Sequence, residues 1–113
     1  MHELSITQSM LDLVVEQARQ AGARKVNTIN LVIGGMTGVV GDSVRFYMDF
    51  LSKETIAEGS VLNIKNIKAQ ARCRECCEEF DIDEFQWQCP VCGNTGIEII
   101  RGTELSVESI EVD

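Results

Sequence analysis

Two pairs of cysteines constrain this chain more than any other feature of its sequence. Two residues separate Cys73 from Cys76 and Cys89 from Cys92, and twelve residues lie between the pairs. Each pair can form a tight knuckle that directs two thiolates to one point, and the intervening segment can fold as a hairpin. Four thiolates at this spacing are typical of a closed structural zinc site, with no coordination position open to a substrate water. The sequence therefore predicts a small zinc-binding module without catalysis at the metal.

Zinc is not the only possible role for the cysteines. Buried core thiols would not fall into two such pairs. Iron in a rubredoxin-like centre remains an alternative that colour would reveal, because Cys89-Pro90-Val91-Cys92-Gly93 suits such a knuckle. A thioredoxin-like redox pair is disfavoured, since neither pair opens a helix after a strand. The fifth cysteine, Cys77, is interpreted as a bystander, with ligand exchange against Cys76 or redox sensitivity as alternatives.

The rest of the chain predicts two helices and several strands. Apolar residues recur at three- and four-residue steps over residues 5–21, which predicts a helix capped by Ser5. The β-branched segment 25–33 predicts a strand buried on at least one face. A second helix is expected over 43–53 and a further strand over 60–70. Because a helix between two strands is typical of a crossover, these strands are expected to be parallel.

Residues 104–112 alternate between apolar and polar side chains and predict a strand that returns to the same sheet. We therefore expect an α+β fold: a small mixed three-stranded sheet with two helices, plus an inserted zinc-ribbon or rubredoxin-like knuckle module. The expected domains are residues 1–70 with 101–113, and residues 71–100 as the zinc-binding domain. Within the module, residues 80–87 are expected to form a hairpin of two short strands.

Charge excludes several classes of partner. The 113 residues include 10 Lys and Arg against 18 Asp and Glu, a formal net charge of -8. A field of this sign repels nucleic acid and anionic lipid, so a protein partner is expected. No segment approaches the ~20 apolar residues that span a bilayer, and the chain starts without a signal peptide, which favours the cytoplasm. Because so small a sheet can exchange strands, we expect a monomer or a weak homodimer.

The amino terminus carries the only histidine of the chain, His2. A terminal residue is usually mobile and chemically inert, which is the simplest interpretation. Alternatively, the Met1 amine with the backbone nitrogen and imidazole Nδ1 of His2 can close two adjacent chelate rings around square-planar Ni(II) or Cu(II). The backbone nitrogen of Glu3 could complete the square. Met1 is expected to remain, since a bulky second residue prevents its removal.

These features together resemble a known family. The chain shares with HypA/HybF, the nickel-insertion accessory proteins of hydrogenase maturation, the start Met1-His2-Glu3 before an amphipathic helix, a strand ending in Ile33-Gly34, the two-knuckle module, and the closing strand Ser109-Ile110-Glu111-Val112. The resemblance covers essentially the whole chain. It implies that His2 is the nickel ligand, with the Met1 amine and the backbone at His2 and Glu3 as co-ligands. It also implies structural zinc on Cys73, Cys76, Cys89 and Cys92.

The resemblance further implies a nickel metallochaperone. Family members deliver nickel to the [NiFe]-hydrogenase large subunit together with the HypB GTPase, and some also serve urease. The helix after the amino terminus is expected to present the face that meets the GTPase. Unlike some members, this chain has no histidine near the knuckles, so a second-site histidine ligand has no candidate.

Two further classes of function compete with the metallochaperone. A zinc-ribbon adaptor would need only residues 73–92, and His2 would be dispensable. An enzyme is not expected, because the single histidine lacks an acceptable nucleophile partner and no Walker lysine follows the glycines of residues 34–41.

Overall fold

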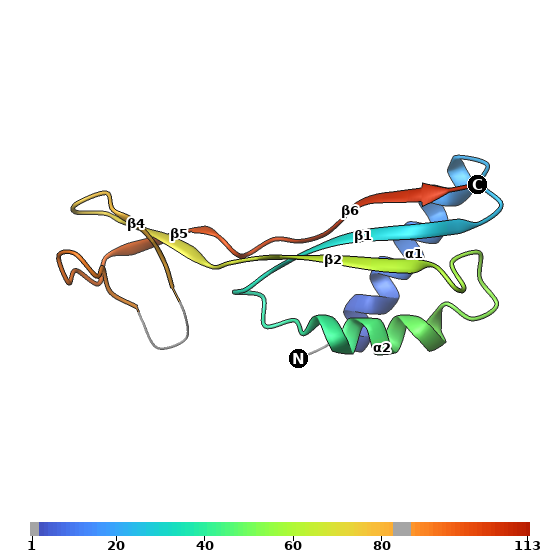
Figure 1. The fold of residues 1–113 in the computed structure, drawn as a ribbon, viewed down its shortest axis with the longest axis horizontal. Coiled ribbons are helices and arrows are strands. Elements are labelled where there is room, and N and C mark those ends of the chain that lie inside the picture. Colours follow the sequence, from blue (N-terminus) through green and yellow to red (C-terminus); the bar gives the residue numbers. More distant parts are fainter. Residues whose placement is uncertain (1–2, 83–86) are drawn as a thin grey trace.

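The computed structural model describes residues 3–82 and 87–113. Its elements are α1 (Glu3–Gln20), β1 (Val26–Gly34), α2 (Gly41–Leu51), β2 (Val61–Ile67), β3 (Gln70–Cys73), β4 (Glu79–Asp81), β5 (Ile97–Arg101) and β6 (Leu105–Val112). They form two three-stranded sheets that follow one another along the long axis of the molecule (Figure 1). Neither described helix is long and apolar enough to cross a bilayer.

The first sheet has the strand order β2-β1-β6. β1 runs parallel to β2 and antiparallel to β6, so the predicted mixed sheet with its parallel pair is confirmed. β1 and β2 are parallel because α2 connects them: the helix returns the chain to the end of the sheet where β1 began, so β2 runs in the same direction. β6 follows the second sheet in the chain and returns to pair with β1. The returning strand that the alternation of residues 104–112 predicted is thereby confirmed.

Both helices pack against one core of this sheet. Ile29 and Leu31 point into it from β1, and both side chains are almost fully buried. The buried residues of this core are Met10, Leu11, Val14, Ala18, Val26, Ile29, Leu31, Ile33, Val44, Met48, Ala57 and Leu62. On the side of the sheet away from this core, polar side chains join the strands: Asn63 Nδ2 donates to Asn30 Oδ1 (3.0 Å), and Asn30 Nδ2 donates to Ser109 Oγ (2.9 Å).

Three predicted elements differ from the structure in their bounds. α2 spans Gly41–Leu51 and so lies two residues before the predicted 43–53. α1 begins at Glu3, so Ser5 lies inside the helix instead of capping it. Within that first turn the Thr7 hydroxyl donates to the Glu3 carbonyl (2.6 Å). The single strand expected over 60–70 is two strands, because β2 ends at Ile67 and the chain then enters the second sheet. Alternation of side chains cannot show such a change of sheet, since both strands are extended.

The second sheet has the order β4-β3-β5, with β3 antiparallel to both neighbours. Its core is small: Ala69, Ala71 and Ile82 are buried, with Met36, Phe80, Ile97 and Ile99 packed against them. β4 pairs with β3 through residues 79–81. The predicted hairpin over residues 80–87, with its turn near residues 83 and 84, includes residues 83–86, which lie outside the described part of the chain.

The two sheets are connected where residues 34–36, 67–69 and 102–104 meet, and we call this contact the joint. The loop after β1 reaches both connecting segments, because the Gly35 N–H donates to the Ile67 carbonyl (2.8 Å) and the Met36 N–H donates to the Gly102 carbonyl (2.7 Å). Gly102 has a φ of +107°, and a Cβ there would lie 2.6 Å from the Ala69 Cα. The joint fixes an elongated molecule with extents of 55 × 24 × 17 Å. The cysteines lie in the part of the chain that contains β3 to β5.

Candidate metal centre

Two knuckles of the same design build the metal centre. In the first, the Cys77 N–H donates to the Cys73 carbonyl (3.0 Å), and in the second the Gly93 N–H donates to the Cys89 carbonyl (2.8 Å). The fifth residue of each knuckle has a left-handed backbone, with φ of 63° at Cys77 and 73° at Gly93. This turn brings the two cysteines of each pair to the same side of the backbone.

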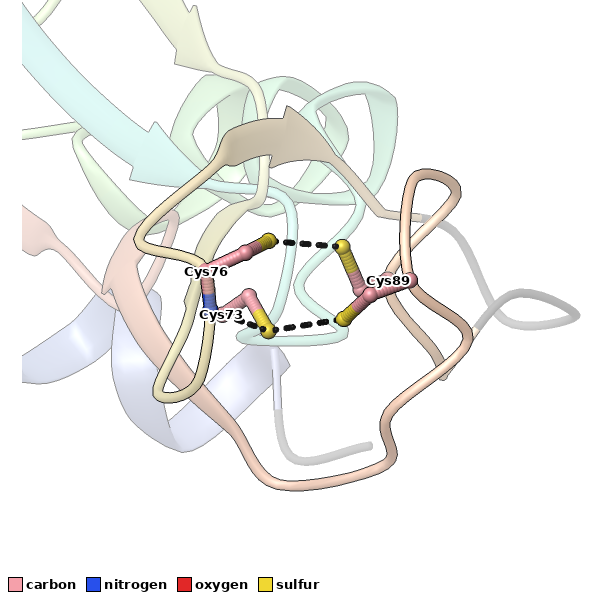
Figure 2. Close-up of side chains that lie close together, drawn as sticks. Cys73, Cys76 and Cys89 are labelled. Carbon is pink, nitrogen blue, oxygen red and sulfur yellow. Dashed lines mark hydrogen bonds between the residues drawn. The ribbon is translucent and has the colours of Figure 1, made fainter.

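The four sulfur atoms face one another across the two knuckles (Figure 2). Cys73 Sγ lies 3.5 Å from Cys92 Sγ, and Cys76 Sγ lies 3.6 Å from Cys89 Sγ. All four Sγ atoms lie within 4.8 Å of one another. A tetrahedron with Zn–S bonds of about 2.3 Å needs sulfur atoms roughly 3.8 Å apart, so this donor set fits a zinc ion in number, type and spacing.

Backbone hydrogen bonds lower the pKa of two of the thiols. The Cys76 N–H points at Cys73 Sγ (3.5 Å), and this backbone donor lowers the pKa of Cys73 to about 7. In the same way the backbone N–H of Cys92 lowers the pKa of Cys89. Both of these residues are buried, whereas Cys76 and Cys92 are exposed. The buried thiol of each pair therefore loses its proton at lower pH than the exposed one.

The other two thiols hold their protons more tightly. The Glu78 N–H lowers the pKa of Cys76. Although the residue is exposed, partial desolvation of its sulfur inside the cluster and hydrogen bonds with the neighbouring thiols outweigh this effect and raise the pKa to about 12. The Asn94 N–H lowers the pKa of Cys92, but the hydrogen bond with Cys73 and partial desolvation of the sulfur outweigh it and raise the pKa. A metal must therefore displace the protons of Cys76 and Cys92, so its binding releases protons.

The structure brings together all four cysteines that the spacing singled out and leaves Cys77 outside the cluster. Cys77 is exposed. Within residues 3–82 and 87–113, no second group of His, Cys, Asp and Glu converges in this way. Four thiols alone complete a tetrahedral donor set, as the interpretation of a closed site requires.

Of the predicted nickel ligands, the structure describes only Glu3. Met1 and His2 are outside the described residues, so the structure does not test the proposed chelate. Glu3 is described and opens α1. Its Oε2 atom is buried and has no hydrogen-bond partner among the residues that the structure describes. The burial of this carboxylate arises from packing in the folded chain, so no pattern in the sequence predicts it.

Comparison with known proteins identifies the family. A family model described as "Hydrogenase/urease nickel incorporation, metallochaperone, hypA" matches residues 1–112. The chain belongs to the HypA family. The resemblance inferred from the amino-terminal motif and the knuckles is thereby confirmed.

Relatives of similar length support this HypA membership. The hydrogenase maturation factor HypA of Caldanaerobacter subterraneus is 45% identical, with 100% of both chains covered. That of one Dehalococcoides mccartyi strain is 48% identical over 100% of this chain and 95% of the relative. Because such relatives are named maturation factors, this HypA chain is an accessory protein and not an enzyme.

Solved structures of HypA proteins share the fold. The solution structure of the Ni metallochaperone HypA from Helicobacter pylori matches with a TM-score of 0.65 and 24% identity, covering 99% of this chain and 97% of that one. A second solution structure of a HypA protein matches with a TM-score of 0.72 and 23% identity, covering 99% and 96%. The predicted fold class is confirmed by this likeness and by the two helices, small sheets and four-cysteine cluster.

Proposed function

We propose that this HypA-family protein binds Ni(II) at its amino terminus and helps to insert it into the [NiFe]-hydrogenase large subunit, with urease as a second recipient. The observation that carries the proposal is the match of residues 1–112 to a family of nickel incorporation. Residues 1–70 with 101–113 would form the nickel-binding domain, and residues 71–100 the zinc-binding domain. The HypB GTPase is the proposed partner, and the cytoplasm the proposed compartment.

The two metals have different chemical requirements. The four-cysteine cluster would hold Zn(II), because soft thiolates in a closed tetrahedron bind zinc tightly and leave no exit route. Nickel as cargo needs exchangeable ligands instead. His2, with the Met1 amine and the backbone nitrogens of His2 and Glu3, offers a nitrogen-rich set suited to square-planar Ni(II). This difference would let the protein release nickel while zinc keeps the second sheet folded.

Nickel titration of untagged, zinc-loaded protein tests the proposal. Wild-type protein is expected to bind one equivalent and to show the d–d absorbance of square-planar nickel. Binding should be lost in His2→Ala, and also in a variant with extra residues before Met1, because the free amine no longer lies beside the imidazole. Unchanged binding in both variants would place nickel elsewhere and favour a zinc-ribbon adaptor.

The proposed chelate also has a pH dependence. Its imidazole and amine must be deprotonated to bind nickel, and an unperturbed imidazole has a pKa near 6.5. Nickel affinity is therefore expected to fall as the pH decreases from about 8 to 6. Calorimetric titration across this range measures the effect, and an affinity that did not change would contradict the imidazole ligand.

A further inference from the structure

The backbone holds the two knuckles of the metal centre against each other. Each knuckle is closed by its own hydrogen bonds, from Cys77 to Cys73 in the first and from Gly93 to Cys89 in the second. A further bond joins the two: the N–H of Arg74, which lies in the first knuckle, donates to a carbonyl that follows the second, that of residue 96 (3.0 Å). The fold of this segment therefore sets where the four sulfur atoms lie.

Two sulfur contacts run from one knuckle to the other (Figure 2). Cys73 Sγ lies 3.5 Å from Cys92 Sγ, and Cys76 Sγ lies 3.6 Å from Cys89 Sγ. Because the sulfur atoms of a disulfide are about 2.05 Å apart, each sulfur would move by only roughly 0.8 Å to form a bond across its contact. The two contacts use each of the four cysteines once, so together they define one complete pairing of the centre.

Each contact joins an exposed cysteine to a buried one. Cys76 and Cys92 are exposed, whereas Cys73 is 0% exposed and Cys89 is 1% exposed. Oxidation of cysteine begins at thiolates that the oxidant can reach. A small oxidant therefore meets the exposed sulfur of each contact first, and the buried sulfur beside it is in position to react with the product.

We propose that the metal centre is a redox switch, in which a peroxide forms one disulfide between Cys73 and Cys92 and another between Cys76 and Cys89, so that zinc is released. A thiol reductant restores the four thiolates. The inference is independent of nickel and rests only on the zinc part of the proposed function. It differs from the thioredoxin-like reaction, in which the disulfide forms inside one C-x2-C pair.

The reaction moves two electrons from each pair of sulfurs to one peroxide. The Cys76 thiolate attacks one oxygen of hydrogen peroxide, the O–O bond breaks and hydroxide leaves, which gives a sulfenic acid. The Cys89 thiolate then attacks Cys76 Sγ, the S–O bond breaks and a second hydroxide leaves. Each hydroxide takes up a proton and becomes water. Cys92 and Cys73 react in the same way, so that no thiolate remains to hold zinc.

The proposed disulfides connect the same two knuckles that zinc connects. The second sheet has a core of only three buried residues and depends on such a connection. One disulfide joins residues 19 apart in the chain and the other joins residues 13 apart, so both restrict the unfolded chain. Disulfides inside the knuckles would leave the two knuckles unconnected. The switch therefore exchanges metal for covalent closure while the second sheet stays folded.

Peroxide titration of the full-length zinc-loaded protein tests the proposal. Zinc content is measured first, and a chromophoric chelator then reports free zinc as hydrogen peroxide is added. About two equivalents of peroxide are expected to release one equivalent of zinc and to lower the free thiols from five to one, that of Cys77. Excess dithiothreitol should restore all five thiols and zinc binding by exchange, because its own two sulfurs form a disulfide.

Peptide mapping under acidic conditions identifies the pairing. Cleavage after glutamate separates Cys73, the pair Cys76 and Cys77, and the second knuckle into three peptides. The proposed pairing links all three peptides into one species. Pairing inside the knuckles would leave the peptide of the second knuckle unattached. Fragmentation at the bond before Pro90 then assigns the partner of Cys89.

Two variants and one measurement of folding complete the experiment. Cys77→Ser is the matched control, and both its zinc release and its pairing should equal those of wild-type protein. In Cys92→Ser the disulfide between Cys76 and Cys89 should still form, while Cys73 stays reduced. In oxidised wild-type protein, amides of β3 to β5 should exchange as slowly as with zinc and about tenfold or more slowly than in reduced protein treated with chelator.

Four results would overturn the proposal. The first is any other pairing, including disulfides inside a knuckle or to Cys77, and the second is sulfinic or sulfonic acid in place of disulfides. The third is zinc that stays bound in excess peroxide, and the fourth is rapid exchange of β3 to β5 in the oxidised protein. If the protein held no zinc at the start, the zinc part of the proposed function would fail, and the same peptide map would still decide the pairing.

Discussion

Cys77 and Gly93 occupy equivalent positions in the two knuckles but differ in the strain they bear. Both have a left-handed backbone, with φ of 63° and 73°, and both donate their N–H to the first cysteine of their knuckle. Glycine adopts this conformation without cost, whereas a residue with a Cβ does not. Cys77 is therefore a strained residue whose thiol lies outside the metal centre.

Substitution of Cys77 tests this strain. Cys77→Gly is expected to stabilise the zinc-loaded protein by about 1 kcal/mol, because it removes the left-handed strain. Cys77→Ala keeps the Cβ and should leave stability nearly unchanged, so it separates strain from loss of the thiol. Thermal unfolding at saturating zinc measures both variants. A strong loss of zinc affinity in Cys77→Ala would instead support ligand exchange at this thiol.

At the scale of elements, the joint between the sheets depends on backbone contact. The loop after β1 donates hydrogen bonds to the end of β2 and to the turn before β6, so one loop ties both connecting segments. Glu104 strengthens this turn, because its carboxylate accepts the Gly102 N–H (2.7 Å). Hydrogen bonds from the backbone N–H groups of Glu104 itself and of Gly102 lower the pKa of Glu104. The ionised form therefore favours the folded joint, and this contribution is lost as the pH falls through the lowered pKa.

Gly102→Ala tests the close approach at the joint. The substitution should destabilise the protein by roughly 3 kcal/mol, because a Cβ would meet the Ala69 backbone and φ is unfavourable. Gly59→Ala is the matched control: φ there is also positive, at +79°, but a Cβ meets nothing within 4 Å. Its expected cost is about 1 kcal/mol. Equal losses in chemical denaturation would show that backbone strain alone, and not the joint, explains the effect.

At the scale of the whole molecule, the protein has two separate hydrophobic cores of unequal size. The first sheet and its helices share a core of twelve buried residues, whereas the second sheet buries only Ala69, Ala71 and Ile82. So small a core rarely folds alone, and a structural metal can supply the missing free energy. Zinc would therefore matter to the second sheet much more than to the first.

Zinc removal is the corresponding prediction. Chelation should increase amide exchange in β3 to β5 while α1, α2 and β1 stay protected. It should become easier as the pH decreases, because Cys76 and Cys92 have raised pKa values and take up protons on metal release. Hydrogen exchange with and without chelator, at two pH values, measures both effects. Simultaneous loss of protection in α1 would show that the two cores unfold as one.

Local patterns in the sequence were sufficient for both helices, for the mixed first sheet and for the four-cysteine cluster. The spacing of Cys73, Cys76, Cys89 and Cys92 predicted a cluster that the structure shows, because a knuckle is a short-range turn. Periodicity predicted both helices and the mixed sheet, since side chains alternate with the backbone period. The amino-terminal motif indicated the HypA family before any fold was known.

Only the tertiary structure decided what depends on contacts between distant segments. The pairing of β4 with β3, the change of sheet after Ile67 and the close approach at Gly102 join residues far apart in the chain. The burial of side chains also depends on such contacts. The apolar residues of α2 look alike in sequence, but packing buries Met48 and leaves Phe46 exposed. Sequence sets which side chains are available, and the folded chain sets which of them meet, because contact is a property of three-dimensional distance.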